Sequence, residues 1–242
     1  MRNIRLTIEY DGTNYIGWQR QDNGISIQGE IERVLLQIIQ ERVSVIGAGR
    51  TDAGVHARRQ VANFLTNSEL AADSIRGGLN GLLREDIVIH STQEVPLEFN
   101  ARHTARGRQY SYHILRERTA IERNFAWQVG YPLDLELMKR AAQHILGSHD
   151  FEAFCKANSD VQHHRCTVYT ATWSENGPRL VFVIRADRFL YGMVRAIVGT
   201  MVDVGRGHIT LDDFQGIMER RSRAEAGVAA PPKGLFLEEV YY

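Results

Sequence analysis

The sequence has 242 residues with 29 basic and 29 acidic side chains, so it carries no net charge at neutral pH. This balance argues against a protein that coats nucleic acid without preference. No run approaches the roughly 18 apolar residues needed to span a membrane. The N-terminus has no apolar signal-peptide region, and two cysteines are too few for a disulfide framework. A cytoplasmic protein with reduced cysteines and no membrane contact is therefore expected.

Arginine supplies nearly all of the positive charge. Lysine occurs only at Lys139, Lys156 and Lys233, so all but three of the 29 basic residues are arginines. Guanidinium groups favour planar, two-point contact with phosphates and base edges, but a lineage-wide preference for arginine explains the same count equally well. Between residues 100 and 125 arginines outnumber carboxylates, which indicates a modest attraction for a polyanion.

The first half of the chain alternates strand and helix patterns. Residues 2–10 alternate apolar and polar side chains, as a half-buried strand does. Ser26 can cap a helix whose apolar residues follow the helical spacing to Ile39. The elements expected next are a strand at 43–46, a strand at 59–65, a helix over 69–83 and a strand over 86–95.

The second half repeats this order. It is expected to contain a strand over 108–115, a helix from Asp134 through Leu146 that Gly147 closes, a strand over 164–173, a hairpin turn at Asn176-Gly177, a strand over 180–184, a helix over 189–204, a short helix over 211–220 and a strand over 234–242. Apart from the short helix, both halves read strand-helix-strand-strand-helix-strand, which is the ferredoxin-like order.

We therefore predict an α+β protein with two ferredoxin-like, RRM-like subdomains, spanning residues 1–104 and 105–242. Each is expected to have an antiparallel sheet with helices on one face, which leaves the other face free to carry a ligand, as in RNA-recognition sheets. A cleft between two such subdomains is a common place for a functional site.

The stretch 47–57 is over-equipped for a connection between two strands. It has three glycines, and it places Arg50 and Asp52 two residues apart. It lacks the Lys-Ser/Thr of a phosphate-binding P-loop and the third glycine and following helix of a dinucleotide fingerprint. A structural loop whose polar side chains bond its own backbone and a functional loop fit these residues equally well.

Two residues of the second half are candidates for the same site. Tyr110 lies in the strand over 108–115, where tyrosines usually bury their rings, so a core role is the simpler interpretation. Arg195 lies within the apolar run Met193–Val198. A buried arginine without a partner costs several kcal/mol, so Arg195 must reach the surface or find a carboxylate. A pair with Asp52 would satisfy Arg195 and keep Asp52 ionised.

Five strings, in this order, resemble segments of the TruA family of tRNA pseudouridine synthases: YDGTNYIGWQRQ, GRTDAGVHA, FNAR with the Tyr110 strand, FLYGMVRAIVG and GLFLEEVYY. The resemblance spans nearly the whole chain. It implies that Asp52 is the catalytic carboxylate and that Tyr110, Arg195 and Leu235 complete the active site. Gly192 and Ala196 stand where the family often has His and Asn, and His103-Thr104 replaces a commoner Phe-Ser pair.

The resemblance also implies the reaction and its partners. Family members isomerise uridine to pseudouridine at positions 38 to 40 in the anticodon stem-loop of tRNA, without metal or organic cofactor, and act as homodimers. Arg50 would contact the RNA. Arg102 and Arg108 are further expected RNA contacts, as are Gln19 and Arg20, although composition alone fits a water-facing role for Gln19 and Arg20 equally well.

Two other classes of function compete with this interpretation. A non-catalytic RNA-binding module would have the same repeated fold and arginines, but it gains nothing from a carboxylate aimed at a polyanion. A metal- or nucleotide-dependent enzyme is the other class, raised by His144, His149, His163 and His164. These histidines lack a recognisable ligand spacing, so no metal site is predicted.

Overall fold

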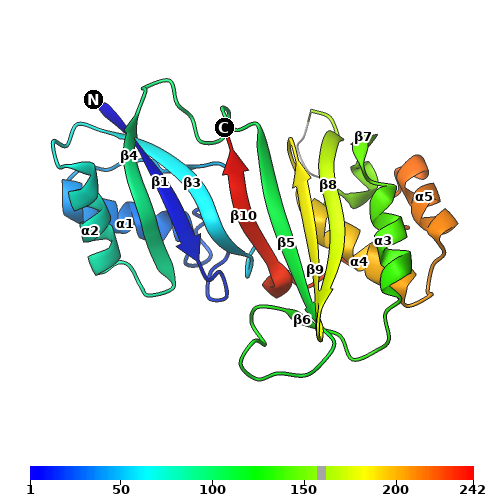
Figure 1. The fold of residues 1–242 in the computed structure, drawn as a ribbon. Helices are drawn as coiled ribbons and strands as arrows, with labels where there is room; N and C mark the ends of the chain where they lie inside the picture. Colours follow the sequence, from blue (N-terminus) through cyan, green and yellow to red (C-terminus); the bar gives the residue numbers. More distant parts are fainter. Residues whose placement is uncertain (157–161) are drawn as a thin grey trace. The chain divides into compact units, whose positions relative to one another are not determined.

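The computed structural model describes residues 1–156 and 162–242, which form two compact units (Figure 1). Unit 1 consists of Met1–Arg106 and Phe236–Tyr242, and unit 2 consists of Gly107–Leu235. The predicted α+β class is confirmed. Among the helices of the described residues, none has the length and apolar character that a membrane span requires.

Unit 1 has the ferredoxin-like strand order. Its elements are β1 (Arg2–Tyr10), α1 (Ile27–Ile39), β2 (Ile46–Gly47), β3 (His56–Thr66), α2 (Ala72–Leu82), β4 (Ile87–Val95) and β10 (Leu235–Tyr241), whose first residue belongs to unit 2. The sheet runs β4-β1-β3 with antiparallel pairing, and β2 joins β3 antiparallel. The four strands of this half therefore lie in the order that the sequence pattern predicts.

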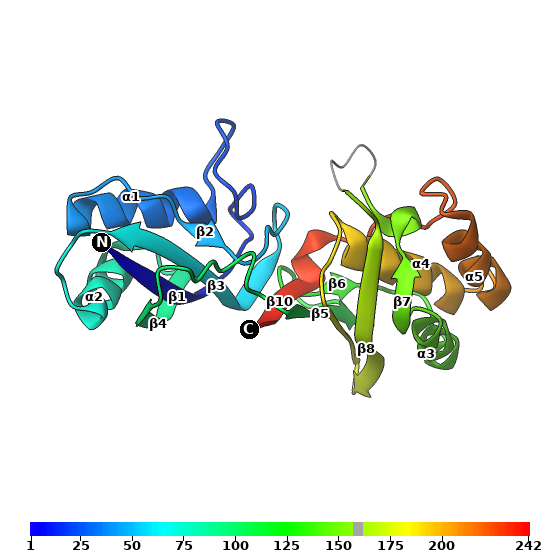
Figure 2. The ribbon, with the colours of Figure 1, turned by 90° about the horizontal axis from the view of Figure 1, so that it is seen from above.

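The core of unit 1 lies between the sheet and its two helices, and Figure 2 shows α1 on one side of the strands. Alternate residues of β1 point into it, and Ile4, Leu6 and Ile8 are fully buried. Ser26 caps α1, because its hydroxyl accepts a hydrogen bond from the Gly29 N–H at 3.2 Å. Burial of each such aliphatic side chain contributes about 1.5–3 kcal/mol, so the strand and helix periods together fix this layer.

Unit 2 repeats the arrangement with additions. Its elements are β5 (Gly107–Leu115), β6 (Trp127–Gln128), α3 (Leu135–Gln143), β7 (Gly147–Asp150), the 3₁₀ turn η1 (Glu152–Phe154), β8 (Arg165–Asn176), β9 (Arg179–Ala186), α4 (Met193–Gly205), α5 (Leu211–Arg220) and the 3₁₀ turn η2 (Pro232–Gly234). Its sheet runs β5-β9-β8-β7 with antiparallel pairing, and β6 pairs parallel with β5. Helices α3, α4 and α5 contact one another and group together in Figure 1.

The observed division of the chain differs from the predicted one at the C-terminus. The prediction placed residues 105–242 in one subdomain, whereas Phe236–Tyr242 group with unit 1. There β10 runs parallel to β3, with Phe236 opposite His56. Ion pairs from Arg58 to Glu238 at 3.4 Å and from Arg59 to Glu239 at 3.1 Å add to this pairing. Side-chain contacts that link residues about 180 apart are not visible in a strand pattern.

The strand predicted at 43–46 is reduced to Ile46–Gly47 in β2. Side chains of α1 satisfy the backbone at the preceding residue instead. The Val45 N–H donates to Glu32 Oε1 at 2.9 Å, and the Val45 carbonyl accepts from Gln28 Nε2 at 3.1 Å. A backbone that is already hydrogen-bonded in this way has no need of a strand partner.

Two predicted helices in unit 2 are shorter than expected. The helix predicted from residue 189 begins at Met193, because Gly192 has φ of 71° in the left-handed region and ends the preceding loop. The helix predicted through Leu146 ends at Gln143, and Gly147, with φ of 91°, opens β7 instead of closing the helix. The predicted hairpin after Asn176 and the extra helix α5 are both present.

Candidate active site

The loop between β2 and β3 carries Asp52, and the segment after β1 holds it in place. The Trp18 N–H donates to the Thr51 carbonyl at 3.1 Å, and the Gly54 N–H donates to the Tyr15 carbonyl at 3.3 Å. Asp52 therefore lies between two backbone hydrogen bonds to one neighbouring segment. Its own side chain is partly exposed, as a carboxylate that meets a substrate must be.

A buried side-chain contact fixes the residue directly before Asp52. The hydroxyl of Tyr10, at the end of β1, lies 2.8 Å from Oγ1 of Thr51. Tyr10 is 2% exposed and Thr51 is 7% exposed. Hydrogen bonds between buried groups are costly to lose, so this contact restrains the backbone from which the Asp52 side chain projects.

Two glycines outside the loop allow this close approach. A Cβ at Gly12 would lie 2.0 Å from the carbonyl oxygen of Val55, and a Cβ at Gly17 would lie 2.5 Å from that of Thr51. Gly17 also has φ of 110°, which other residues rarely adopt. The glycine-rich character of the Tyr10–Gln21 string therefore serves the neighbouring Asp52 loop.

His56 also holds the Asp52 loop against the segment after β1. This residue was not singled out from the sequence. Its imidazole is buried, and Nδ1 accepts a hydrogen bond from the Gly12 N–H at 3.1 Å. The same nitrogen lies 3.1 Å from Asp11 Oδ1, a contact that is ionic only when the ring is protonated. The ring also stacks on Phe236, with the centroids 4.7 Å apart. His56 thus joins the loop, the segment after β1 and the C-terminal strand of unit 1.

The arginines predicted to contact RNA differ in their surroundings. Arg50 and Arg102 are exposed. Arg20 is exposed and pairs with Glu32 at 3.0 Å. Arg108 in unit 2 is partly buried, and its Nη1 donates to the Asp187 carbonyl at 3.2 Å. Gln19 is partly buried.

Two buried asparagines anchor the segment that carries Arg102. Asn63 Nδ2 donates to Asn3 Oδ1 at 2.9 Å, and Asn63 Oδ1 accepts from the Ala101 N–H at 2.8 Å. Asn3 Nδ2 in turn donates to the Phe99 carbonyl at 2.9 Å. Both asparagines lie on the sheet face opposite the core, which was expected to be open. That face is therefore partly covered by the FNAR stretch.

In unit 2, Tyr110, Arg195 and Leu235 lie on three different elements. Tyr110 is on β5 and 8% exposed, and its ring meets Phe189 edge to face with the centroids 5.0 Å apart. Leu235 is the buried first residue of β10. The packing of Tyr110 matches the simpler core interpretation. The same contact sets the angle between the Tyr110 and Phe189 rings, which is 85°.

Arg195 hydrogen-bonds to a backbone group that the sequence did not indicate as its partner. The guanidinium Nε donates to the Ala230 carbonyl at 2.7 Å, and the Ala230 N–H donates back to the Arg195 carbonyl at 2.9 Å. The predicted pair of Arg195 with Asp52, and the approach of Tyr110 to both, remain predictions.

The positions that depart from the family pattern are tolerated locally. Gly192 is the left-handed residue before α4, and a Cβ there would meet no atom within 4 Å. Ala196 is buried in α4. His103 is exposed, and its N–H donates to Asn100 Oδ1 at 3.1 Å.

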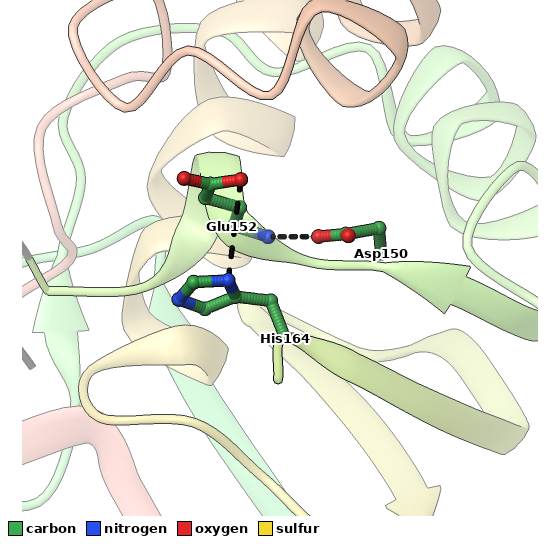
Figure 3. Close-up of side chains that lie close together, drawn as sticks. All are labelled: Asp150, Glu152 and His164. Carbon is green, nitrogen blue, oxygen red and sulfur yellow. Dashed lines mark hydrogen bonds and ion pairs between the residues drawn. The ribbon is translucent and has the colours of Figure 1, made fainter. Parts of the chain in front are cut away.

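Of the four histidines that raised a metal site, His164 lies in a cluster with Asp150 and Glu152 (Figure 3). His164 Nδ1 is 3.9 Å from Glu152 Oε2. Asp150 already accepts from the Glu152 N–H at 3.1 Å and pairs with Arg221 at 3.3 Å. An ion pair and a turn-type hydrogen bond account for this arrangement, and exposed acidic groups alone do not define a metal site.

The other three histidines have separate surroundings. His149 Nε2 lies 2.6 Å from the Leu146 carbonyl, and His163 Nε2 lies 3.1 Å from Arg188 Nη1. His144 follows the last residue of α3. The four histidines are therefore not gathered around one point.

Comparison with known proteins gives one consistent result. The sequence model of a family described as tRNA pseudouridine synthase matches residues 6–103 and 141–242. These ranges include Asp52, Arg195 and Leu235 but not Tyr110. A Cbf5-Nop10-Gar1 complex matches 96% of this chain and 57% of that chain with 12% identity and a TM-score of 0.38, a likeness too low to carry a conclusion.

Curated relatives match over 97–100% of their own length. The chain is 43% identical over 244 residues to a tRNA pseudouridine synthase A of Clostridium acetobutylicum and 46% identical to that of Acetivibrio thermocellus, with 100% of each chain covered. It is 41% identical to that of Exiguobacterium sibiricum, covering 100% of this chain and 97% of the relative. With the family model matched over most of the chain and relatives above 40% identity from end to end, the chain belongs to the tRNA pseudouridine synthase family.

Proposed function

We propose that this chain isomerises uridine to pseudouridine at positions 38, 39 and 40 of the tRNA anticodon stem-loop, with Asp52 as the catalytic carboxylate. As a tRNA pseudouridine synthase, the chain is an isomerase that acts on uridine in tRNA. The observation that carries the assignment to Asp52 is its setting: a partly exposed carboxylate on a backbone restrained by the buried Tyr10–Thr51 contact.

The reaction needs a single ionised carboxylate. The bond from C1′ to N1 of uracil breaks, the base rotates, and a bond from C1′ to C5 forms, after which C5 loses its proton and N1 gains one. A carboxylate can attack or stabilise C1′, or remove a sugar proton, while the base leaves as a delocalised anion. A restrained backbone suits each of these routes, because a fixed reacting group saves orientational entropy.

The target base must leave the helical stack, which costs a few kcal/mol. Arg50 is exposed, and its planar guanidinium can stack in the vacated space as a base does. In this proposal Tyr110 stacks on the extruded uracil, Arg195 pairs with Asp52, and Leu235 lines the site. Gln19, Arg20, Arg102 and Arg108 contact the RNA, and no cofactor takes part.

The proposal includes a cytoplasmic homodimer whose two subunits share one tRNA, as the family resemblance implies. Sedimentation or light scattering of the purified chain would measure its mass in solution. A monomer that retains full activity on tRNA would remove the dimer from the proposal and leave the reaction untouched.

The positions are tested by replacing the uridines at 38, 39 and 40 with cytidine, singly and together, in a tRNA transcript. Pseudouridine is then mapped by its carbodiimide adduct, which stops reverse transcription. We expect each single replacement to remove only its own stop. Stops elsewhere in the tRNA that survive the triple replacement would contradict the anticodon assignment.

The role of Asp52 is separated from RNA binding by Asp52→Ala. Turnover should be abolished while the Kd for tRNA stays within a few-fold of wild type, since the carboxylate adds nothing to the attraction for a polyanion. A non-catalytic RNA-binding module would show no turnover in the wild type either.

A further inference from the structure

One face of α4 carries both Arg195 and the features that hold it. Residues four apart in a helix share a face, so Arg195 and Gly199 lie one above the other, beside Ala196 and Thr200. The segment Gly227–Pro231, here called the strap, runs along this face. Its contacts with α4 and β5 all lie within unit 2.

Besides the bond from the Arg195 side chain, three hydrogen bonds join the strap to α4 and β5. The Gly227 N–H donates to Thr200 Oγ1 at 3.0 Å, and the Ala230 N–H donates to the Arg195 carbonyl at 2.9 Å. The hydroxyl of Tyr112, on β5, donates to the Pro231 carbonyl at 2.7 Å. Thr200 and Tyr112 are fully buried, so the strap is fixed at both ends by groups shielded from water.

Gly199 sets how closely the strap approaches α4. A Cβ at this position would lie 1.9 Å from the Val228 carbonyl oxygen and 3.2 Å from the Ala230 nitrogen. The obstructing atoms are backbone atoms of the strap, which cannot turn aside as a flexible side chain would. Any other residue at 199 would therefore push the strap away from the helix.

The distance of the strap from α4 determines where the Arg195 guanidinium points. Its Nε donates to the Ala230 carbonyl at 2.7 Å. Because the guanidinium is planar, this bond restrains the direction in which the group presents its two terminal amino groups. A strap displaced by about 1 Å would turn the group, and misplacements of that size can cost about 100-fold in rate.

We propose that the strap, held by Thr200, Gly199 and Tyr112, is the positioning element for Arg195 in pseudouridine formation. This inference rests on the proposed role of Arg195 beside Asp52. The strap acts on the reaction by orienting Arg195. Thr200 and Gly199 act one step further back, by setting the position of the strap.

The most direct test compares Thr200→Val with Thr200→Ser. Thr200 Oγ1 accepts from Gly227 and donates to the Ala196 carbonyl at 2.8 Å. Valine keeps the shape and removes the hydroxyl, while serine keeps the hydroxyl. We expect the valine variant to lower kcat on tRNA about tenfold or more with KM within about twofold, and the serine variant to restore kcat.

A double-mutant cycle with Arg195→Lys distinguishes positioning from loosening of the fold. If Thr200 acts through Arg195, the valine substitution should change single-turnover rates by less than about twofold when Arg195 is lysine. An unchanged kcat in the Thr200→Val single variant overturns the inference, and so does a tenfold loss that persists in the lysine background.

A second pair of variants covers the case in which Thr200→Val melts at a much lower temperature. Tyr112→Phe removes only the hydroxyl bond to Pro231 and should lower kcat in the same Arg195-dependent way. Gly81→Ala in α2, where a Cβ meets no atom within 4 Å, is the control and should leave kcat unchanged. A kcat of Tyr112→Phe equal to wild type overturns the inference.

The outcomes separate the two levels of the argument. A wild-type chain without activity on any tRNA would defeat the proposed function. An active wild type, an Arg195→Lys variant that is slowed but still measurable in single turnover, and a fully active Thr200→Val variant would together defeat only the positioning inference.

Discussion

The hydroxyl of Tyr10 and the hydroxyl of Thr51 lie 2.8 Å apart in a buried contact, and Thr51 is the residue directly before Asp52. Tyr10 ends the first strand of the chain, which lies between β4 and β3, so the candidate catalytic loop is tied to a central strand of the unit 1 sheet. Strands are rigid compared with loops, and a site supported by them holds its geometry better.

Tyr10→Phe should lower both stability and turnover. The substitution removes one buried hydrogen bond and leaves the Thr51 hydroxyl without this partner, which costs about 1 kcal/mol in the free energy of unfolding. If the contact positions Asp52, kcat should fall by about tenfold. Urea denaturation and tRNA turnover measure the two effects. Tyr169→Phe, at a ring that is 53% exposed, is the matched control and should change neither.

Gly17→Ala should disrupt the attachment of the Asp52 loop. The new Cβ would lie 2.5 Å from the Thr51 carbonyl oxygen, at a backbone φ of 110°. We expect a loss of at least about 2 kcal/mol in the free energy of unfolding together with most of the activity. In Gly81→Ala the added methyl group is accommodated, and stability should rise by about 0.5–1 kcal/mol. Equal effects of the two substitutions would contradict the role given to Gly17.

Asn63→Ala should weaken the segment that carries Arg102. The change leaves the Ala101 N–H and the Asn3 amide oxygen without their partner, and each buried group left in this way costs about 1–3 kcal/mol. The free energy of unfolding should fall accordingly, and KM for tRNA should rise because Arg102 is less well placed. Asn67→Ala, at an exposed position, should stay within about 0.5 kcal/mol of wild type.

The buried Cys166 thiol is expected to make the free energy of unfolding depend on pH in the alkaline range. Burial raises the pKa of its thiol to about 12, so the folded state keeps the proton where the unfolded state, with a cysteine pKa of about 8.5, has released it. The contribution is therefore fully present below about pH 8.5 and is lost as the pH rises toward 12. Above about pH 8.5, the free energy of unfolding should fall more steeply in wild type than in Cys166→Ala. Parallel pH profiles for the two proteins would contradict this.

The fold followed from the sequence wherever one face of an element is buried. Alternation in β1 and the helical spacing in α1 both reflect burial against one layer, and both elements were predicted close to their true limits. The strand at 43–46 failed for a physical reason. Gln28 and Glu32 of α1 satisfy the backbone of Val45, and no local pattern reveals a side chain that reaches from another element.

The residues of the candidate site also fall into those that a local sequence pattern indicates and those that it does not. Asp52 and Arg50 could be proposed from the sequence because their motif is a continuous string. Tyr10, His56 and Asn63 were missed as supporting residues because each contacts a partner that is distant in sequence. Tyr10 bonds a residue 41 positions away, and Asn63 bonds one 60 positions away. Such contacts exist only after the sheet has formed.

The central claim is that Asp52 performs uridine isomerisation in tRNA. The most direct measurement is tritium release from a tRNA transcript that carries C5-tritiated uridine, because formation of the bond from C1′ to C5 expels that hydrogen. The purified wild-type chain should release tritium without added metal or nucleotide. Asp52→Asn, which keeps the shape and removes the charge, should release none above background. Release by the asparagine variant at the wild-type rate, or no release by the wild type, would contradict the claim.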